Sequence, residues 1–506
     1  MKTSRRRFLS SAASVSAGFF GLRQWTSHGL AQGFSGMLPR LRREEEQYQN
    51  ELSRYGPLIS DPNRIFDLPD GFHYTVISRV GDLMSDGFRV PGAPDGMAAF
   101  EGENGRVILI RNHELAPEMT FDGPFGVDNS LFGKADRARI FDAGEGTRPH
   151  QGGTTTLVYD PATQTVERQF MSLAGTCRNC AGGPTPWKSW ISCEETVEVS
   201  WESEKKAKKQ RGREVEEEAS AEPAKPEKRE NFNEKDHGYN FEVPADSAGS
   251  LVTPAPLTAM GRFNHEAIAV DPHSGIVYQT EDRDDGLIYR FIPHEPGKLA
   301  SGGKLQALAI RGRSACDTRN WPETGKAKLP INAGFDVEWI DLDKVESPRD
   351  DLRTRGYKKG AACFARGEGM WYGRSEIFFA CTNGGISKTG QIFRYRPSEF
   401  EGTEREQESP GRLVLYLEPN NTHLIQSCDN LTVAEWGDLF ICEDGLEHNY
   451  LRGVTTDGKI YTLGDSAYFL RSELCGVCFA PNHPTLFVNL QRPGLTLAIT
   501  GPWVMG

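Results

Sequence analysis

Four pairs of residues that could do metal or acid–base chemistry share one spacing. In each pair a thiol or carboxylate precedes a carboxylate or amide by 15 positions. The pairs are Cys180 with Glu195, Glu266 with Glu281, Glu368 with Asn383 and Asp429 with Asp444. A turn signal lies near the middle of each interval, and a hairpin brings the start of its first strand beside the end of its second. The spacing therefore predicts that each pair meets at one end of a hairpin.

These hairpin ends would gather several carboxylates and one thiol into a ring. We expect the ring to contain Cys180, Glu195, Glu266, Glu281, Glu368, Asp429 and Asp444. Like charges repel strongly in a low dielectric, so the ring needs protons or cations. Carboxylate and amide oxygens suit Ca²⁺, and a thiolate among them indicates a transition metal as well. A lone glutamate at a strand end is ordinarily a solvated loop residue, but a spacing shared by four hairpins favours metal binding.

The elements that would position this ring are short β-strands with a common pattern. A β-branched or aromatic run ends in polar residues six times, and three copies are followed by a second matching run. The six runs cover residues 106–114, 189–195, 275–282, 376–383, 438–444 and 485–491, and the second runs cover residues 286–291, 390–395 and 458–463. Repeated sheets with variable spacers are typical of a β-propeller, so we expect an all-β, six-bladed propeller. The alternative is an ordinary sandwich with coincidentally similar strands.

The N-terminal segment has the features of an export signal. Arg5 and Arg6 precede an apolar run from Leu9 to Leu22, and Ala31 offers a cleavage position. This order is typical of a twin-arginine signal, and the run is too short and polar to span a bilayer comfortably. We expect residues 1–31 to engage the twin-arginine translocon during export. The product would be periplasmic or secreted, without stable membrane insertion.

The remaining sequence is predicted to form a linker with a short helix, residues 32–59, and a β-domain, residues 60–506. Residues 202–236 are nearly all Lys, Glu, Arg and Ala, a low-complexity insertion to which we assign no function. A formal net charge of −12 argues against nucleic acid as a partner and suits cation binding. We expect a monomer. The absence of a G-x-S-x-G elbow, a P-loop and an H-E-x-x-H motif weakens serine hydrolase, kinase and zincin interpretations.

The ten cysteines allow two further interpretations. Some could form disulfides in an oxidising compartment. Alternatively, Cys177-x-x-Cys180 and Cys475-x-x-Cys478 could form one zinc site, although their separation is far longer than in a compact zinc module.

Several motifs together resemble the PhoX-type alkaline phosphatases, over about residues 60 to 500. The motifs are Gly175–Trp187 (GTCRNCAGGPTPW), Ile191–Glu195 (ISCEE), Gly261–Glu266 (GRFNHE), Arg366–Gly369 (RGEG), Asp429–Val433 (DNLTV) and Ile441–Gly445 (ICEDG). The resemblance implies a six-bladed propeller with Fe³⁺ and Ca²⁺ at the mouth of its channel. It also implies hydrolysis of phosphate monoesters and some diesters as small-molecule substrates.

The resemblance further implies roles for individual residues. Cys180 would supply a thiolate to iron, and Glu195, Glu266 and Glu368 would hold iron, bridge to calcium, or do both. The calcium ligands would be Glu114, Glu194, Asp282, Asn430, Glu443 and Asp444. Arg366 would contact the substrate phosphate, and with Glu266 and Glu368 it forms the predicted catalytic set. His113 and His265 would either hydrogen-bond a metal ligand or be structural.

Two departures from the family pattern leave alternatives open. A disulfide between Cys177 and Cys180 would remove the thiolate that iron needs, and Gly182 occupies a position that is often Asn in the family. A calcium-dependent, lactonase-like propeller hydrolase would need the carboxylates but neither Cys180 nor Arg366. A non-catalytic calcium-binding propeller would hydrolyse nothing.

Overall fold

The computed structural model describes residues 51–206, 231–326, 328–446, 448–468 and 472–504. Short antiparallel strands form most of the regular structure there, and helices are few and short, such as α4 (Leu352–Lys358). None of the helices in these ranges is long and apolar enough to cross a membrane. The predicted signal and the middle of the charged insertion lie outside the described residues. Residues 51–59, the described part of the predicted linker with its short helix, are not helical.

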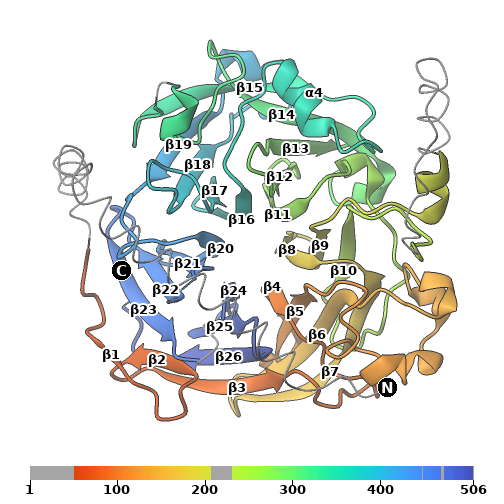
Figure 1. Cartoon of the computed structure of the whole chain (residues 1–506). Helices are drawn as coiled ribbons and strands as arrows, with labels where there is room; N and C mark the ends of the chain where they lie inside the picture. Colours follow the sequence, from red (N-terminus) through yellow and green to blue (C-terminus); the bar gives the residue numbers. More distant parts are fainter. Residues whose placement is uncertain (1–50, 207–230, 327, 447, 469–471, 505–506) are drawn as a thin grey trace, which may run out of the picture. The chain divides into compact units, whose positions relative to one another are not determined.

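The sheets are arranged around a common centre, as in a propeller (Figure 1). The strands nearest the centre are β4 (Pro94–Glu101), β8 (Asn179–Pro184), β11 (His265–Val270), β16 (Gly367–Gly373), β20 (Cys428–Val433) and β24 (Leu474–Phe479). Each of these inner strands contacts the next one, and β24 contacts β4. The inner strands therefore form a closed ring.

Each inner strand pairs with the strand that follows it in the sequence. These second strands are β5 (Val107–His113), β9 (Ser189–Glu194), β12 (Val277–Glu281), β17 (Glu376–Cys381), β21 (Leu439–Glu443) and β25 (Thr485–Leu490). They coincide with the six polar-ended runs of the sequence. Every residue of these strands is buried, which explains why the runs are almost continuously apolar up to their ends.

The outer strands complete the sheets. They are β6 (Gly152–Asp160), β7 (Thr165–Thr176), β10 (Asn240–Pro244), β13 (Ile288–Pro293), β14 (Gly303–Ile310), β15 (Gly334–Asp341), β18 (Gln391–Arg396), β19 (Arg412–Leu417), β22 (Tyr450–Val454), β23 (Ile460–Ser466) and β26 (Leu495–Thr500). β15 pairs with both β14 and β19, which joins two sheets into one of nine strands. The run at residues 458–463 is β23, and β22 precedes it. The sequence missed β22 because Arg452 and Gly453 interrupt its apolar character.

An N-terminal strand closes the arrangement. β3 (His73–Arg79) pairs with β26 and so completes the sheet of the last three strands. Two further strands, β1 (Leu58–Ile59) and β2 (Phe66–Pro69), extend the sheet of β23. Among the described residues, the pairing of β3 with β26 thus joins an early and a late segment of the chain in one sheet, which closes the circle of sheets.

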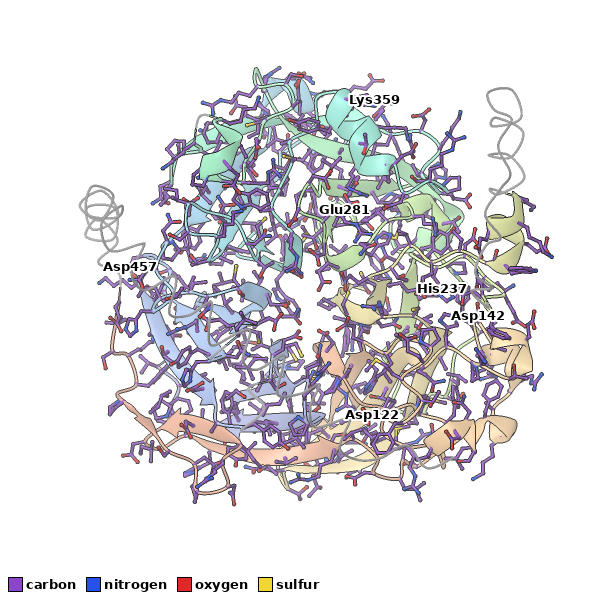
Figure 2. All side chains as sticks on the ribbon, viewed as in Figure 1. Asp122, Asp142, His237, Glu281, Lys359 and Asp457 are labelled. Carbon is purple, nitrogen blue, oxygen red and sulfur yellow. The ribbon has the colours of Figure 1, made fainter. Side chains whose placement is uncertain are left out.

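Apolar side chains form buried clusters along the sheets, and Figure 2 draws them together with the other described side chains. Phe379, for example, is 1% exposed, and its ring centroid lies 5.2 Å from that of Phe393 and 5.6 Å from that of Phe364. Burying an aromatic side chain of this size stabilises the fold by about 1.5–3 kcal/mol. Phe379 lies on β17 and Phe393 lies opposite it on β18, so this packing ties an inner hairpin to the next strand of its sheet.

Candidate metal centre at the inner hairpin ends

The same irregularity occurs in all six inner hairpins. In each hairpin, the inner strand has one residue more than its partner between two successive paired positions. In the third hairpin, for example, His265 pairs with Glu281 and Ile268 pairs with Gln279, so three residue steps on β11 correspond to two on β12. The other five hairpins repeat this pattern. One extra residue on one strand is a β-bulge, which bends the strand and turns a side chain aside.

The first bulged residue of five hairpins carries a functional side chain. We call these residues the inner ring: Asp95, Cys180, Glu266, Glu368 and Asp429. The sixth hairpin has Gly476 at this position. All five inner-ring side chains are buried. The bulge thus brings one reactive group per hairpin to the centre of the molecule.

Gly or Ala follows four of the five inner-ring residues, because neighbouring bulges nearly touch. A Cβ atom on Gly96 would lie 2.5 Å from the Cα of Ala181, and one on Gly369 would lie 2.7 Å from the Cα of Asn430. Both distances are too short for any side chain. The close approach brings the inner-ring residues of adjacent hairpins together.

Side chains on three second strands hold the bulged backbone of a neighbouring hairpin. Asn112 donates to the carbonyls of Cys180 and Ala181 at 3.1 and 2.6 Å. Thr280 donates to the carbonyl of Glu368 at 2.7 Å, and Asn489 donates to that of Asp95 at 2.6 Å. These bonds satisfy backbone carbonyls that the bulges leave without a partner in the β-sheet. They therefore hold the backbone of the inner-ring residues in place.

A second group of carboxylates surrounds the inner ring. We call it the outer ring: Glu114, Glu195, Asp282 and Asp444, each the residue directly after a second strand. The N–H of each bonds the carbonyl of the residue that precedes its inner strand, as from Glu195 to Arg178 at 2.9 Å. Asp282 is buried, Glu114 and Glu195 are partly buried, and Asp444 is exposed. The outer ring therefore forms the solvent-facing edge of the site.

The two rings contain closely spaced carboxylates. Oxygen atoms of Glu266, Glu368 and Asp429 lie within 4.8 Å of one another, and Asp95 forms a similar group with Glu473 and Cys475. Gln491 donates to Glu114 at 3.0 Å and also lies 3.4 Å from Asp95. Gln491 thus links the outer ring to the inner ring.

Burial and mutual repulsion make these carboxylates hard to ionise. Burial, and then the charges of neighbouring carboxylates, raise the pKa of Glu195 to about 8. Burial and Asp444 raise the pKa of Asp429 to about 7. The pKa values of Glu266 and Glu368 are raised well above the ordinary range for the same reasons. A cation bound here would remove the repulsion, so the donor set fits metal ions.

Two arginines lie at the rings. Arg366 donates to both oxygens of Asp282 at 2.7 Å and lies 2.9 Å from Glu368. Its side chain keeps 40% exposure. Arg178, which sequence reasoning missed, is exposed and lies 3.9 Å from Glu114. Both residues have left-handed backbone, with φ of 50° and 49°, directly before an inner strand.

Three predicted site residues point away from the rings. Glu194, Glu281 and Glu443 are the last residues of β9, β12 and β21, and side chains alternate along a strand, so the residue after each one faces the centre instead. Glu281 accepts bonds from Leu287 N and Tyr289 Oη. Glu443 accepts from Arg452 Nε at 3.0 Å. The predictions for Glu194 and Glu443 as calcium ligands, and for Glu281 in the ring, therefore need correction.

Asn430 and the two predicted histidines have other partners. Asn430 donates to Asp429 at 2.7 Å, and its amide oxygen accepts from Gly476 N at 2.7 Å, so it orients a ring residue rather than offering a free oxygen. His113 contacts Gly92 O and Thr155, and His265 contacts Gly261 O. Both ring nitrogens of His113 thus have structural partners, whereas His265 Nδ1 is buried without a hydrogen-bond partner. Asn383, paired with Glu368 by spacing, donates instead to Asp284.

Two carboxylates of the site were missed in the sequence. Asp95 belongs to a hairpin whose ends are 19 residues apart, Asp95 to Glu114, rather than 15. Asp95-Gly96 nevertheless repeats the pattern of Glu266-Ala267 and Glu368-Gly369, in which a small residue follows an acidic one. This pattern could have identified Asp95 as a site residue from the sequence. Glu473 precedes β24 instead of occupying its bulge. No repeated spacing marks it.

All ten cysteines are free thiols. The structure therefore contradicts a Cys177–Cys180 disulfide. The Cys180 thiol points to the carbonyl of His265 at 3.3 Å, whereas Cys475 points to that of Pro94 at 3.1 Å. Cys478 packs among apolar side chains, so the four cysteines do not form the suggested zinc site. Burial and the nearby Glu266 raise the pKa of Cys180 well above its usual range, so a thiolate there requires a cation.

The fold and the site define a propeller-like protein with a buried acidic centre. A family profile described as Alkaline phosphatase PhoX matches residues 53–494. The chain is also similar to the solved structure of Pseudomonas fluorescens PhoX in complex with vanadate, a transition state analogue. The TM-score is 0.59 and the identity 17%, over 88% of this chain and 97% of that chain. No curated protein matches the chain.

A solved gluconolactonase from Xanthomonas campestris has a TM-score of 0.34 and 11% identity, over 88% of this chain and 98% of that chain. The profile match covers most of the sequence, and the chain belongs to the PhoX family of alkaline phosphatases. It is a phosphomonoesterase of a metal-dependent family, which decides against the lactonase-like and non-catalytic alternatives.

Proposed function

We propose that this chain is a six-bladed propeller phosphatase whose two rings hold Ca²⁺ and Fe³⁺. Six inner strands form a closed ring, and each begins a hairpin with the same bulge. One hairpin per blade gives six blades. Two of these blades share the nine-stranded sheet through β15.

The observation that carries the metal assignment is the buried thiol of Cys180 beside the inner-ring carboxylates. Thiolate and carboxylate ligands together suit iron, whereas sets of oxygen atoms suit calcium. Cys180, Glu266 and Glu368 would hold the ferric ions. Asp95, Asp429, Glu473 and the outer ring would hold calcium. When bound, these cations supply Lewis acidity that offsets charge on the phosphate and on the departing oxygen.

The protein's own residues would bind and orient the phosphate ester. Asp282 fixes the Arg366 guanidinium through two hydrogen bonds of 2.7 Å, so the donors that remain are held in one orientation. Arg guanidinium matches phosphate geometry through paired N–H donors. Arg178 would add a second positive group on the exposed side. The small-molecule ester would thus approach from the outer ring.

We also propose that the protein acts outside the cytoplasm. Paired arginines before an apolar run support twin-arginine export. That route carries folded proteins, which suits a protein whose metals must be inserted between six hairpins before export. The periplasm or the medium would then be the place where phosphate is released.

Replacing Cys180 by serine tests the metal assignment. Serine keeps the size of the side chain but is a poor ligand for iron, so we expect iron to be lost while most calcium stays. Turnover of a phosphate monoester should fall by more than about 100-fold, since even changes outside the ligand shell cost 10–100-fold. Elemental analysis and kcat would be measured on the same preparation.

Cys478→Ser is the matched control, because Cys478 is also buried but packs among apolar side chains. It should keep wild-type iron and turnover despite some loss of stability. Wild-type iron content and kcat in Cys180→Ser would contradict the assignment of iron to this thiol.

A further inference from the structure

Three arginines gather in the sheet of β15, β17, β18 and β19, away from the two rings. Arg394 and Arg396 lie on β18, and Arg412 begins β19. All three line a cavity of about 230 Å³, which we call the arginine cavity. Glu376 is the only carboxylate among the described residues that line it. Glu376 begins β17, which reaches the rings only at its other end. The cavity therefore has an excess of positive charge far from the metal centre.

The strand register places the three guanidinium groups on one face of the sheet. Side chains alternate along a strand, so Arg394 and Arg396 share a face, whereas Tyr395 between them packs in the core. Arg412 lies directly opposite Arg396 across β18 and β19. Like charges directly opposite one another destabilise a sheet. This pair therefore calls for negative charge close to both guanidinium groups.

The described carboxylates supply this negative charge only in part. Glu376 Oε1 accepts from Arg396 Nε and Nη2 at 3.0 and 2.8 Å. Glu376 Oε2 lies 3.4 Å from Arg394 Nη1, and Asp336 Oδ1 lies 3.8 Å from Arg412 Nη1. Both separations exceed the usual length of a hydrogen bond. Arg394 Nε is buried without a hydrogen-bond partner, and a buried donor of this kind indicates a missing ion or water.

Gly334 on β15 allows Arg412 to reach the arginine cavity. Arg412 Nη2 donates to the carbonyl of Gly334 at 3.1 Å, and both residues line the cavity. A Cβ atom on Gly334 would lie 2.5 Å from Arg412 Nη2. Any side chain at position 334 would therefore displace the guanidinium group.

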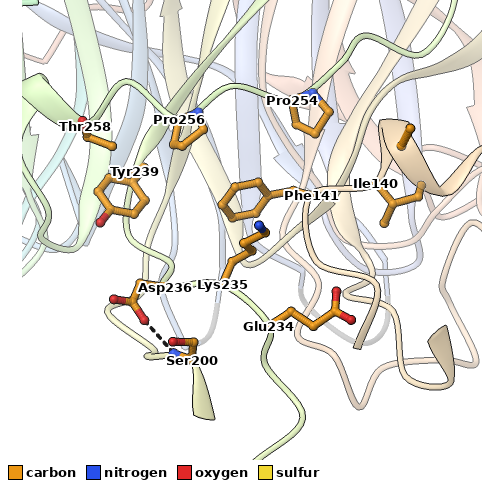
Figure 3. Close-up of a pocket in the computed structure, with 11 residues that line it drawn as sticks. Ile140, Phe141, Ser200, Glu234, Lys235, Asp236, Tyr239, Pro254, Pro256 and Thr258 are labelled. Atoms are coloured by element: carbon orange, nitrogen blue, oxygen red, sulfur yellow. Dashed lines mark hydrogen bonds between the residues drawn. The ribbon is translucent and has the colours of Figure 1, made fainter. Parts of the chain in front are cut away.

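A larger cavity elsewhere in the molecule has the opposite balance of charge. It has a volume of about 520 Å³, and Figure 3 shows Lys235 in its lining together with Glu234 and Asp236. One ammonium group there faces two carboxylates. The excess of positive charge is thus a property of the arginine cavity and not of cavities in this protein generally.

We propose that Arg394, Arg396 and Arg412 form a second anion site, which binds a phosphate group without metal ions. Guanidinium groups match phosphate through paired N–H donors. A water molecule occupies about 30 Å³ of the liquid, so the cavity has room for a phosphate ion with several waters. Inorganic phosphate is the product of a phosphomonoesterase, so this ligand is present wherever the protein acts. The phosphate of a lipid headgroup offers the same chemistry.

Equilibrium dialysis of the metal-loaded protein against radiolabelled inorganic phosphate tests the site in solution. Arg412→Gln should weaken phosphate binding at one site about 10–100-fold, because it removes a hydrogen bond between charged groups. Gly334→Ala should weaken the same site by displacing the Arg412 guanidinium. Lys235→Gln is the control, because it removes a positive charge from the other cavity, and it should bind phosphate as the wild type does. Equal binding by the wild type, Arg412→Gln and Gly334→Ala would overturn the proposal.

Diffraction from crystals of the unaltered protein soaked in tungstate locates the anion directly. Tungstate is a tetrahedral oxyanion like phosphate, and we expect an anomalous peak between Arg394, Arg396 and Arg412. A peak in the rings would report separately on the metal centre, so failure of this proposal and failure of the proposed function can be told apart. A map without a peak among the three arginines would overturn the proposal, whether or not tungstate occupies the rings.

Flotation with vesicles distinguishes the two sources of the phosphate group. The vesicles would contain phosphatidylcholine with or without phosphatidylglycerol. Flotation that requires phosphatidylglycerol and is lost in Arg412→Gln would assign the site to a headgroup phosphate. Binding of inorganic phosphate without flotation would assign it to the free ion. If neither ligand bound in a manner that depends on Arg412, the proposal would be wrong.

Discussion

Replacing Glu368 by glutamine is expected to lower kcat for a phosphate monoester by more than about 100-fold. Glu368 is 4% exposed, lies 2.9 Å from Arg366, and clusters with Glu266 and Asp429. Glutamine keeps the volume but removes the negative charge and one ligand oxygen. Bound metal should fall with kcat, and both would be measured on one preparation.

Glu376→Gln provides a matched control within the same hairpin. Glu376 is also buried but begins β17 at the far end from the rings, where it pairs with Arg394 and Arg396. We expect this variant to lose stability without losing metal or kcat. If both variants lost activity equally, the loss would reflect general damage to the hairpin rather than to the site.

Removing the cations is expected to make the stability of the protein strongly dependent on pH. Without metal, burial and neighbouring charge raise the pKa of Glu195 to about 8 and that of Asp429 to about 7. The folded protein then holds these protons more tightly than the unfolded chain does. The protons bound to these two carboxylates therefore contribute fully to the stability of the folded protein below about pH 4. This contribution is lost as the pH rises through 7 to 8.

Thermal unfolding of chelated and reloaded protein between about pH 5 and 9 measures this effect. The Tm of the chelated protein should fall with rising pH, because each uncompensated buried charge costs about 3–5 kcal/mol. Reloaded protein should change much less, since bound cations keep the carboxylates ionised. Asp429→Asn removes one titrating group and should flatten the chelated profile. Parallel profiles with and without metal would mean that the rings are not the metal site.

The sequence predicted the hairpins well because their buried second strands are continuous apolar runs with polar ends. It also predicted most of the ring, since Cys180, Glu266, Glu368 and Asp429 all occupy equivalent bulge positions. It could not predict which of two adjacent acids faces the centre. Glu281 and Asp282 differ by one residue, and strand alternation decides between them only when the strand end is known.

The remaining differences arise from contacts between segments far apart in the sequence. Whether Glu194 joins the rings depends on His237, which lies 43 residues away and donates to it. The amide oxygen of Asn430 is taken by Gly476 N of another hairpin. Such competition between partners is invisible in a linear motif. Twin-arginine export, the domain boundaries and the identities of the ions stay predictions.

Hydrolysis of a chromogenic phosphate monoester at alkaline pH, with elemental analysis of the same sample, tests the central claim most directly. The protein would be purified from a host competent for twin-arginine export. We predict turnover that a chelator abolishes, with calcium and iron both present. Calcium without iron, and no turnover, would contradict the proposal that these rings form a calcium–iron phosphatase centre.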